Sequence, residues 1–182
     1  MSSDALKPGS IFNFRERTLV EFMAQALAME REAVQRYTEF ADAMETHNNT
    51  EVAALFRTMA HYEGKHAEQI MAEMGWTQDT APAADPFAWP EREAPETVPI
   101  DEVHYLMRPW HALKLALAAE QRAEAFFGAL VQAATNEPVR RAALELQAEE
   151  KEHVALVQAW LDKLPLPESD WANDPDPPRY TD

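Results

Sequence analysis

Two short segments of the sequence each place a glutamate three residues before a histidine. Glu63 precedes His66, and Glu150 precedes His153, with the same spacing. On an α-helix, residues three apart lie on one face about one turn apart, so a carboxylate and an imidazole can bind the same metal ion. The repeated spacing therefore predicts two metal-ligating pairs on two helices.

Two further glutamates, Glu30 and Glu120, fall within apolar stripes of the helices expected to precede these pairs. Each half of the chain thus has a helix with one inward glutamate, followed by a helix with Glu-x-x-His. We interpret this spacing as an internal repeat of a helix hairpin. Tyr37 lies two turns after Glu30 on the same stripe, so it is a candidate to hydrogen-bond a ligand, with core packing as the alternative.

For a single glutamate on an apolar stripe, partial exposure or a salt bridge with Lys or Arg is as good an explanation as metal binding. A single histidine on such a stripe more often packs in the core than binds a metal. The set as a whole is harder to explain in this way. The four stripes contain no Lys or Arg to neutralise four carboxylates, and burying an unpaired carboxylate costs several kcal/mol. Two divalent cations would neutralise them, and six ligands would leave coordination positions open. Carboxylate and imidazole ligands suit iron, manganese or zinc. Among these metals we predict iron, with two ions bound.

Apolar residues recur at steps of three and four over four stretches, which predicts four helices. The expected ranges are about 15–47, 50–74, 101–135 and 138–164. Thr50 is the expected N-cap of the second helix, and Gly75 is the expected residue after its C-terminus. Asp101 is a candidate cap of the third helix, but Pro109 would kink that helix or move its start.

Prolines cluster between the second and third expected helices and again after the fourth. We predict a lead-in over residues 1–15, a bundle over 16–164 and a proline-rich acidic tail over 165–182. The connection at 76–100 is too long for a tight turn, so we expect a crossover along the outside of the bundle, anchored by Phe87 and Trp89. The predicted fold is an all-α four-helix bundle, with two helix hairpins joined by a long crossover.

Composition excludes several classes of function. The chain of 182 residues has 32 acidic and 16 basic residues and a net charge of −16, which argues against nucleic-acid or anionic membrane partners. It has no cysteine, so disulfides, thiolate zinc sites and iron–sulfur clusters are excluded. The N-terminal segment has no signal-peptide pattern, and no apolar run approaches the ~20 residues needed to span a bilayer. We expect a cytoplasmic protein.

Four motifs together resemble the ferritin-like superfamily and, within it, the rubrerythrin-like proteins. The motifs are Glu30-x-x-Ala33-x-x-Arg36-Tyr37, Phe56-x-x-Met59-Ala60-x-x-Glu63-x-x-His66, Glu120-x-x-Ala123-x-x-Phe126-Phe127 and Glu149-Glu150-x-x-His153. The likeness covers residues 16–163. It implies a ferritin-like bundle that holds a carboxylate-bridged di-iron centre.

The resemblance also implies the role of each ligand. Glu63 and Glu150 would bridge the two metals. Glu30 and His66 would complete the coordination of one iron. Glu120 and His153 would complete the other.

The resemblance implies that iron(II) at this centre reduces hydrogen peroxide or oxygen. Rubrerythrins carry a rubredoxin-like domain, which the absence of cysteine excludes here, so electrons would come from an external donor or from iron(II) itself. Rubrerythrins also carry a glutamate at the position of Ala123. The remaining six ligands resemble those of bacterioferritin, so a ferroxidase or iron-handling protein is the first alternative. A metal-free or zinc-filled helical interaction module is the second. The resemblance implies a homo-oligomer such as a dimer.

Overall fold

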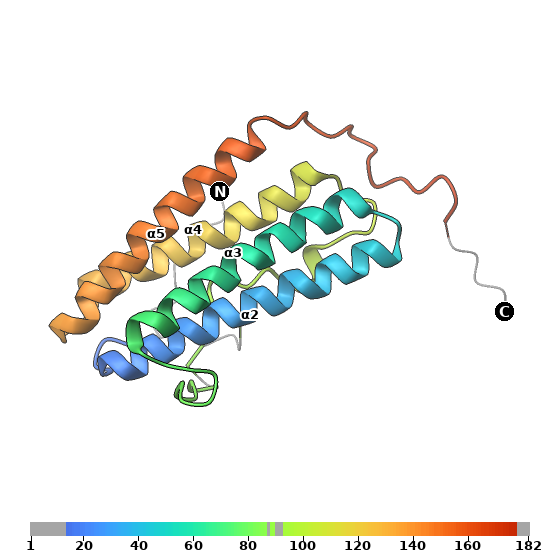
Figure 1. Cartoon of the computed structure of the whole chain (residues 1–182). Helices are drawn as coiled ribbons and strands as arrows, with labels where there is room; N and C mark the ends of the chain where they lie inside the picture. Colours follow the sequence, from blue (N-terminus) through green and yellow to red (C-terminus); the bar gives the residue numbers. More distant parts are fainter. Residues whose placement is uncertain (1–13, 87, 90–92, 178–182) are drawn as a thin grey trace.

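Four long α-helices form a bundle in the computed structural model, which describes residues 14–86, 88–89 and 93–177 (Figure 1). The helices are α2 (Leu19–Thr46), α3 (Thr50–Met74), α4 (Pro109–Ala133) and α5 (Glu137–Leu161), with a short 3-10 helix η1 (Ile100–Glu102) before α4. α2 packs mainly against α3, and α4 packs mainly against α5. The described chain contains no strand, so the predicted all-α bundle of two hairpins is confirmed.

The ends of the first hairpin's helices are set by local hydrogen bonds. Thr18 and Glu21 form a capping box: Glu21 donates its N–H to the Thr18 hydroxyl, and the Thr18 N–H donates to the Glu21 carboxylate over 2.8 Å. α2 therefore begins at Leu19 and not near residue 15 as predicted. Asn49, not Thr50, caps α3. Gly75 ends α3 with φ of 66°, as predicted.

The third helix begins later than its predicted start at Asp101. Asp101 lies in η1, and α4 begins at Pro109, which occupies the first helical position. Proline is favoured there because its missing N–H would have no partner in the first turn. The crossover thus continues to Arg108 instead of ending near residue 100. α5 begins at Glu137 with Pro138 in its first turn, close to the predicted start at residue 138, but it ends at Leu161 and not near residue 164.

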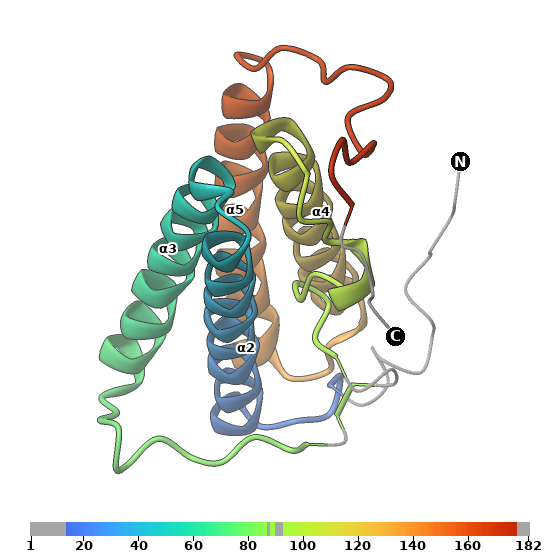
Figure 2. The same ribbon diagram turned by 90° about the vertical axis from the view of Figure 1, so that its right-hand side faces the viewer.

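The crossover is partly inside the bundle, which corrects the prediction that it runs along the outside. Trp89 is buried, stacks on Phe14 at a ring-centroid distance of 4.9 Å and meets Phe126 edge-on. Phe87, the other predicted anchor, lies outside the described residues. Residues 94–98 follow and are mostly buried between α2 and α4 (Figure 2).

Two apolar clusters fill the bundle on either side of its middle. One contains Phe22, Leu27 and Phe127, and the other contains Phe56 and Leu117. These clusters exclude water from the middle of the bundle. The local dielectric constant is therefore low, and charges placed there interact more strongly.

The tail after α5 packs against the first turn of α4 and the segment that precedes it. Trp171 lies on His111 with ring centroids 3.9 Å apart, and the Tyr105 hydroxyl donates a 2.6 Å hydrogen bond to Asp174. Among the described helices, none combines the length and the apolar character needed to cross a membrane.

Candidate metal centre

All six predicted ligands meet in the middle of the bundle, one or two from each helix. The glutamates are 0–2% exposed, and the histidine side chains are 15% and 18% exposed. The six residues are Glu30 on α2, Glu63 and His66 on α3, Glu120 on α4, and Glu150 and His153 on α5.

The first hairpin contributes one group of three potential ligands. Ligand atoms of Glu30, Glu63 and His66 all lie within 4.8 Å of one another. The Nδ1 atom of His66 is 3.2 Å from a Glu63 carboxylate oxygen and 3.7 Å from a Glu30 oxygen. Three side chains from two helices therefore converge on one point, as metal ligands do.

The second hairpin repeats this geometry with Glu120, Glu150 and His153, which also lie within 4.8 Å of one another. The His153 Nδ1 atom is 3.3 Å from a Glu150 oxygen and 3.6 Å from a Glu120 oxygen. These distances nearly equal those of the first group, so the spacing repeat in the sequence corresponds to a structural repeat.

The two groups touch each other. The rings of His66 and His153 stack with their centroids 4.1 Å apart and their planes 10° apart. Ligand atoms of Glu30 and Glu150 lie within 4.8 Å of each other, as do those of Glu63 and Glu120. Glu63 and Glu150, the two bridging candidates, therefore each lie near a glutamate of the opposite hairpin. A ligand that bridges two metals has to be close to the ligands of both.

Several carboxylate oxygens at this place have no hydrogen-bond partner. They include one oxygen of Glu30 and both oxygens of Glu120, and no described Lys or Arg side chain is fully buried. Buried polar atoms in native proteins are nearly always satisfied, so unsatisfied oxygens call for an explanation. Hard oxygen donors together with imidazole nitrogens fit iron, manganese or zinc ions, which would both satisfy the oxygens and neutralise the charge.

Comparisons with known proteins identify the family of this chain. The family model described as Rubrerythrin matches residues 21–106. A crystal structure of an uncharacterized conserved protein from Magnetospirillum magnetotacticum MS-1 is 35% identical, with a TM-score of 0.62. The alignment covers 84% of this chain and 99% of that one.

This chain belongs to the rubrerythrin family of the ferritin-like superfamily. No curated protein sequence matches it. Rubrerythrins typically bind a pair of iron ions, and the two Glu/Glu/His groups are side chains that could hold such a pair.

Burial opposes negative charge in this rubrerythrin-family site. Burial raises the pKa of Glu30 and Glu63 well above the usual range, and neighbouring carboxylates raise it further. Burial likewise raises the pKa of Glu150 to about 7, although its hydrogen bond with His153 acts in the opposite direction. Without a metal, the cluster therefore retains protons near neutral pH, and a bound cation would take their place.

The two imidazoles differ in their electrostatics. Burial lowers the pKa of His66 to about 4, and charge on the neighbouring His153 lowers it further. Burial also acts against a charge on His153, but the nearby carboxylates of Glu120 and Glu150 outweigh that effect and raise its pKa to about 10. Because the rings stack, a charge on one imidazole disfavours a charge on the other.

Tyr37 lies in the core beside this site. It is 1% exposed and stacks on Phe56 with centroids 6.0 Å apart. Its hydroxyl has no hydrogen-bond partner, and burial and the charge of Glu120 raise its pKa. The structure thus places Tyr37 within electrostatic reach of a ligand, and a hydrogen bond to that ligand stays a prediction.

Glu96, in the crossover, is a residue that the sequence reasoning missed. It is 1% exposed, and its carboxylate forms two further groups within 4.8 Å, one with Glu30 and Glu150 and another with Glu63 and Glu120. No periodic pattern marks it, because it lies in an irregular segment.

A small pocket opens beside the imidazoles, between α3 and α5. Apolar and aromatic residues line most of it: Met59, Tyr62, Leu156, Val157 and Trp160. Glu63, Glu120 and both histidines form its inner end. The two histidines, whose side chains are 15% and 18% exposed, are therefore the least buried of the six candidate ligands.

Proposed function

We propose that this chain is a non-haem di-iron oxidoreductase that reduces hydrogen peroxide or oxygen at a carboxylate-bridged iron pair. The observation that carries the proposal is the pair of matched Glu/Glu/His groups, which touch each other and have no fully buried Lys or Arg among the described residues to neutralise their glutamates. Membership of the rubrerythrin family supports iron over zinc or manganese.

The positions of the side chains suggest how each would hold the metals. Glu30 and His66 would bind one ion, and Glu120 and His153 would bind the other. Glu63 and Glu150 would bridge, since each approaches both hairpins. Both histidines direct Nδ1 towards the carboxylates, so Nδ1 would be the ligating atom.

The iron pair, when bound, would supply the electrons that reduce peroxide or oxygen, and an external donor or further iron(II) would replace them. The chain supplies the surroundings of this chemistry. The apolar clusters exclude bulk water from the carboxylates, and the side of the site between α3 and α5, where the histidines are partly exposed, would be the entry for a small oxidant. The Tyr37 hydroxyl, buried and without a partner, is available to donate a hydrogen bond to a ligand.

Rapid mixing of anaerobic iron(II)-loaded protein with hydrogen peroxide or with oxygen tests this function. We expect two irons per chain to be oxidised and the reaction then to stop, with peroxide faster than oxygen. Glu63→Leu/Glu150→Leu should show no such phase. A matched control, Glu68→Leu/Glu152→Leu, changes two exposed glutamates on the same helices and should behave like the wild type.

Three other outcomes would assign a different function. Oxidation of many irons per chain with oxygen would favour a ferroxidase. Binding of iron without any oxidation would argue against redox chemistry. Failure to bind iron at all would leave the helical interaction module.

A further inference from the structure

Glu96 is a fifth buried carboxylate at this site. Only four were predicted from the sequence, those of Glu30, Glu63, Glu120 and Glu150. Both of its oxygens are buried, and no hydrogen-bond donor from outside the carboxylate cluster reaches either of them. Burial raises its pKa well above the usual range, as do the charges of Glu150 and Glu120. A carboxylate in such a position is unfavourable unless a proton or a cation accompanies it.

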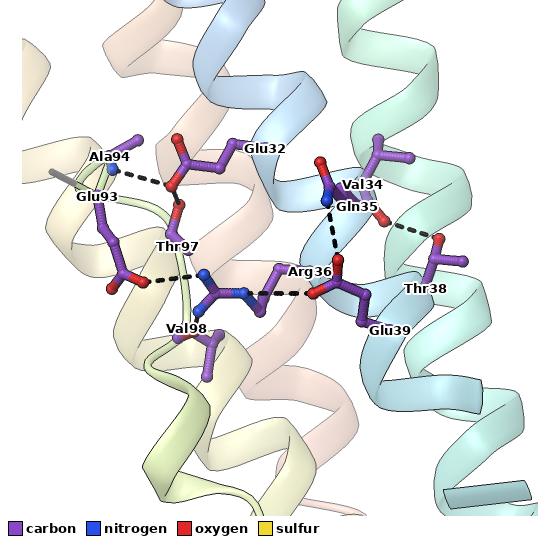
Figure 3. A network of polar contacts seen from close by, with 10 residues as sticks. All are labelled: Glu32, Val34, Gln35, Arg36, Thr38, Glu39, Glu93, Ala94, Thr97 and Val98. Carbon is purple, nitrogen blue, oxygen red and sulfur yellow. Dashed lines mark hydrogen bonds and ion pairs between the residues drawn. The ribbon is translucent and has the colours of Figure 1, made fainter. Parts of the chain in front are cut away.

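The crossover that carries Glu96 is held from α2. Arg36 donates a hydrogen bond to the Val98 carbonyl oxygen and pairs with Glu93 at 2.9 Å, as Figure 3 shows. Glu32 accepts a 2.7 Å hydrogen bond from the Thr97 hydroxyl. The residue that follows Glu96 is thus tied to the same helix that carries Glu30.

The crossover is also held from α4. Arg122 donates to the carbonyl oxygens of Pro95, at 2.8 Å, and of Thr97, at 3.2 Å. These are the residues on either side of Glu96, so its backbone is fixed between two helices. The side chain is therefore preorganised to point at the carboxylate cluster and does not reach it through a flexible loop.

The position of Glu96 relative to the two metal groups is what a shared ligand requires. It lies within 4.8 Å of Glu30 and Glu150 and, in a second group, of Glu63 and Glu120, so it meets ligands of both hairpins. It comes from the α2–α4 side, whereas the pocket opens between α3 and α5. A ligand there completes the closed side of the site and leaves the open side free for a reactant.

We propose that Glu96 is a seventh metal-ligating side chain, supplied by the crossover and positioned by Glu32, Arg36 and Arg122. The proposal rests on the proposed metal-binding function. Rubrerythrins carry a glutamate at the position of Ala123, one turn after Glu120 on α4. In this chain the seventh ligand would instead come from the crossover. A fifth negative charge favours iron(III) over iron(II), so its removal should raise the reduction potential of the centre.

Glu96→Gln tests this ligand role, because glutamine keeps the shape and the hydrogen-bonding capacity of the side chain but loses its charge and is a poor metal ligand. The probe is Mn²⁺ alone, whose free concentration is measured by electron paramagnetic resonance. We expect two Mn²⁺ ions per wild-type chain and at least ~10-fold weaker binding of one or both in the variant, since even residues that only orient ligands cost 10–100-fold. A rise in the reduction potential of the iron-loaded variant is the second readout.

Glu102→Gln is the matched control, because it removes the same charge from an exposed residue of the same crossover that makes none of the contacts holding Glu96 in place. It should bind Mn²⁺ like the wild type. Should Glu96→Gln fail to fold, Glu96→Leu gives the same readout with an apolar group of similar volume.

The outcomes separate the two proposals. Equal affinity and equal potential in wild type and Glu96→Gln would overturn the ligand role and leave the proposed function intact. Equal weakening in Glu102→Gln would also overturn it, because the effect would then be one of general charge. A wild-type chain that binds neither Mn²⁺ nor iron(II) would overturn both proposals.

Discussion

Replacing the two bridging candidates with leucine, as Glu63→Leu/Glu150→Leu, should remove metal binding without destabilising the metal-free protein. Both carboxylates are 1–2% exposed, and they lie among other buried carboxylates, with no fully buried Lys or Arg in the described part of the chain. Replacement of buried ionic groups by apolar residues of similar volume is often neutral or stabilising, by about 1–4 kcal/mol. Each histidine keeps a second carboxylate nearby, since Glu30 is 3.7 Å from His66.

The pKa shifts set the size and the pH window of this effect. The folded-state pKa of Glu150 is raised from 4.5 to about 7, so its contribution to stability is complete below pH 4.5 and is lost as pH rises to about 7. That shift corresponds to about 3 kcal/mol. Glu30, Glu63 and Glu96 shift in the same direction. The pKa of His66 is lowered, so its protonation favours the unfolded chain, and its contribution to stability decreases as the pH falls below 6.5.

Denaturant unfolding of chelator-treated protein at pH 5 and pH 8, followed by helical circular dichroism, measures these differences. We expect the free energy of unfolding of the wild type to be lower at pH 8 than at pH 5. The free energy of unfolding of Glu63→Leu/Glu150→Leu should decrease less over this range and should match or exceed that of the wild type at pH 8. Glu68→Leu/Glu152→Leu, with exposed glutamates, should change the free energy of unfolding by no more than about 0.5 kcal/mol.

A large loss of metal-free stability in Glu63→Leu/Glu150→Leu would refute this reasoning. It would mean that the two carboxylates form net stabilising interactions in the folded chain. Their burial would then need no metal to explain it.

Three further predictions follow from the site and the tail. Mn²⁺ at 100 times its dissociation constant should stabilise wild type by about 2.7 kcal/mol in scanning calorimetry and should leave Glu63→Leu/Glu150→Leu unchanged. Because the pKa of Glu150 is raised to about 7, metal must displace protons below that pH. Affinity for Mn²⁺ should therefore rise from pH 5 to pH 8 with proton release, measured by titration calorimetry in buffers of different ionisation enthalpy, and a pH-independent affinity would contradict this. Trp171→Ala, which removes the ring on His111, should lower the free energy of denaturant unfolding by about 0.5–1.5 kcal/mol. It should leave Mn²⁺ stoichiometry unchanged, and a loss of Mn²⁺ binding would place the tail in the site.

Helical periodicity made the six ligand candidates predictable. Glu30 and Glu120 stand out because they interrupt apolar stripes, and the structure buries both as the stripes imply. The start of α2 was also present in the sequence, since Thr18 and Glu21 have capping-box spacing. Pro109 likewise marks the start of α4, as proline favours the first helical position.

Glu96 could not be found in the same way. It lies in an irregular segment, so no period of 3.6 or 2 relates its neighbours to a buried face. Its burial depends on Arg36 and Arg122, which are distant in the sequence and hold the crossover through its backbone carbonyls. Such contacts leave no local pattern, because every residue has a carbonyl to offer.

Anomalous diffraction at the iron edge, from crystals loaded anaerobically with iron(II), tests the metal centre most directly. We predict two peaks in the middle of the bundle, one beside the Nδ1 atom of His66 and one beside the Nδ1 atom of His153, with Glu96 adjacent to both. No peak, a single peak, or peaks only on the acidic surface would contradict a di-iron site.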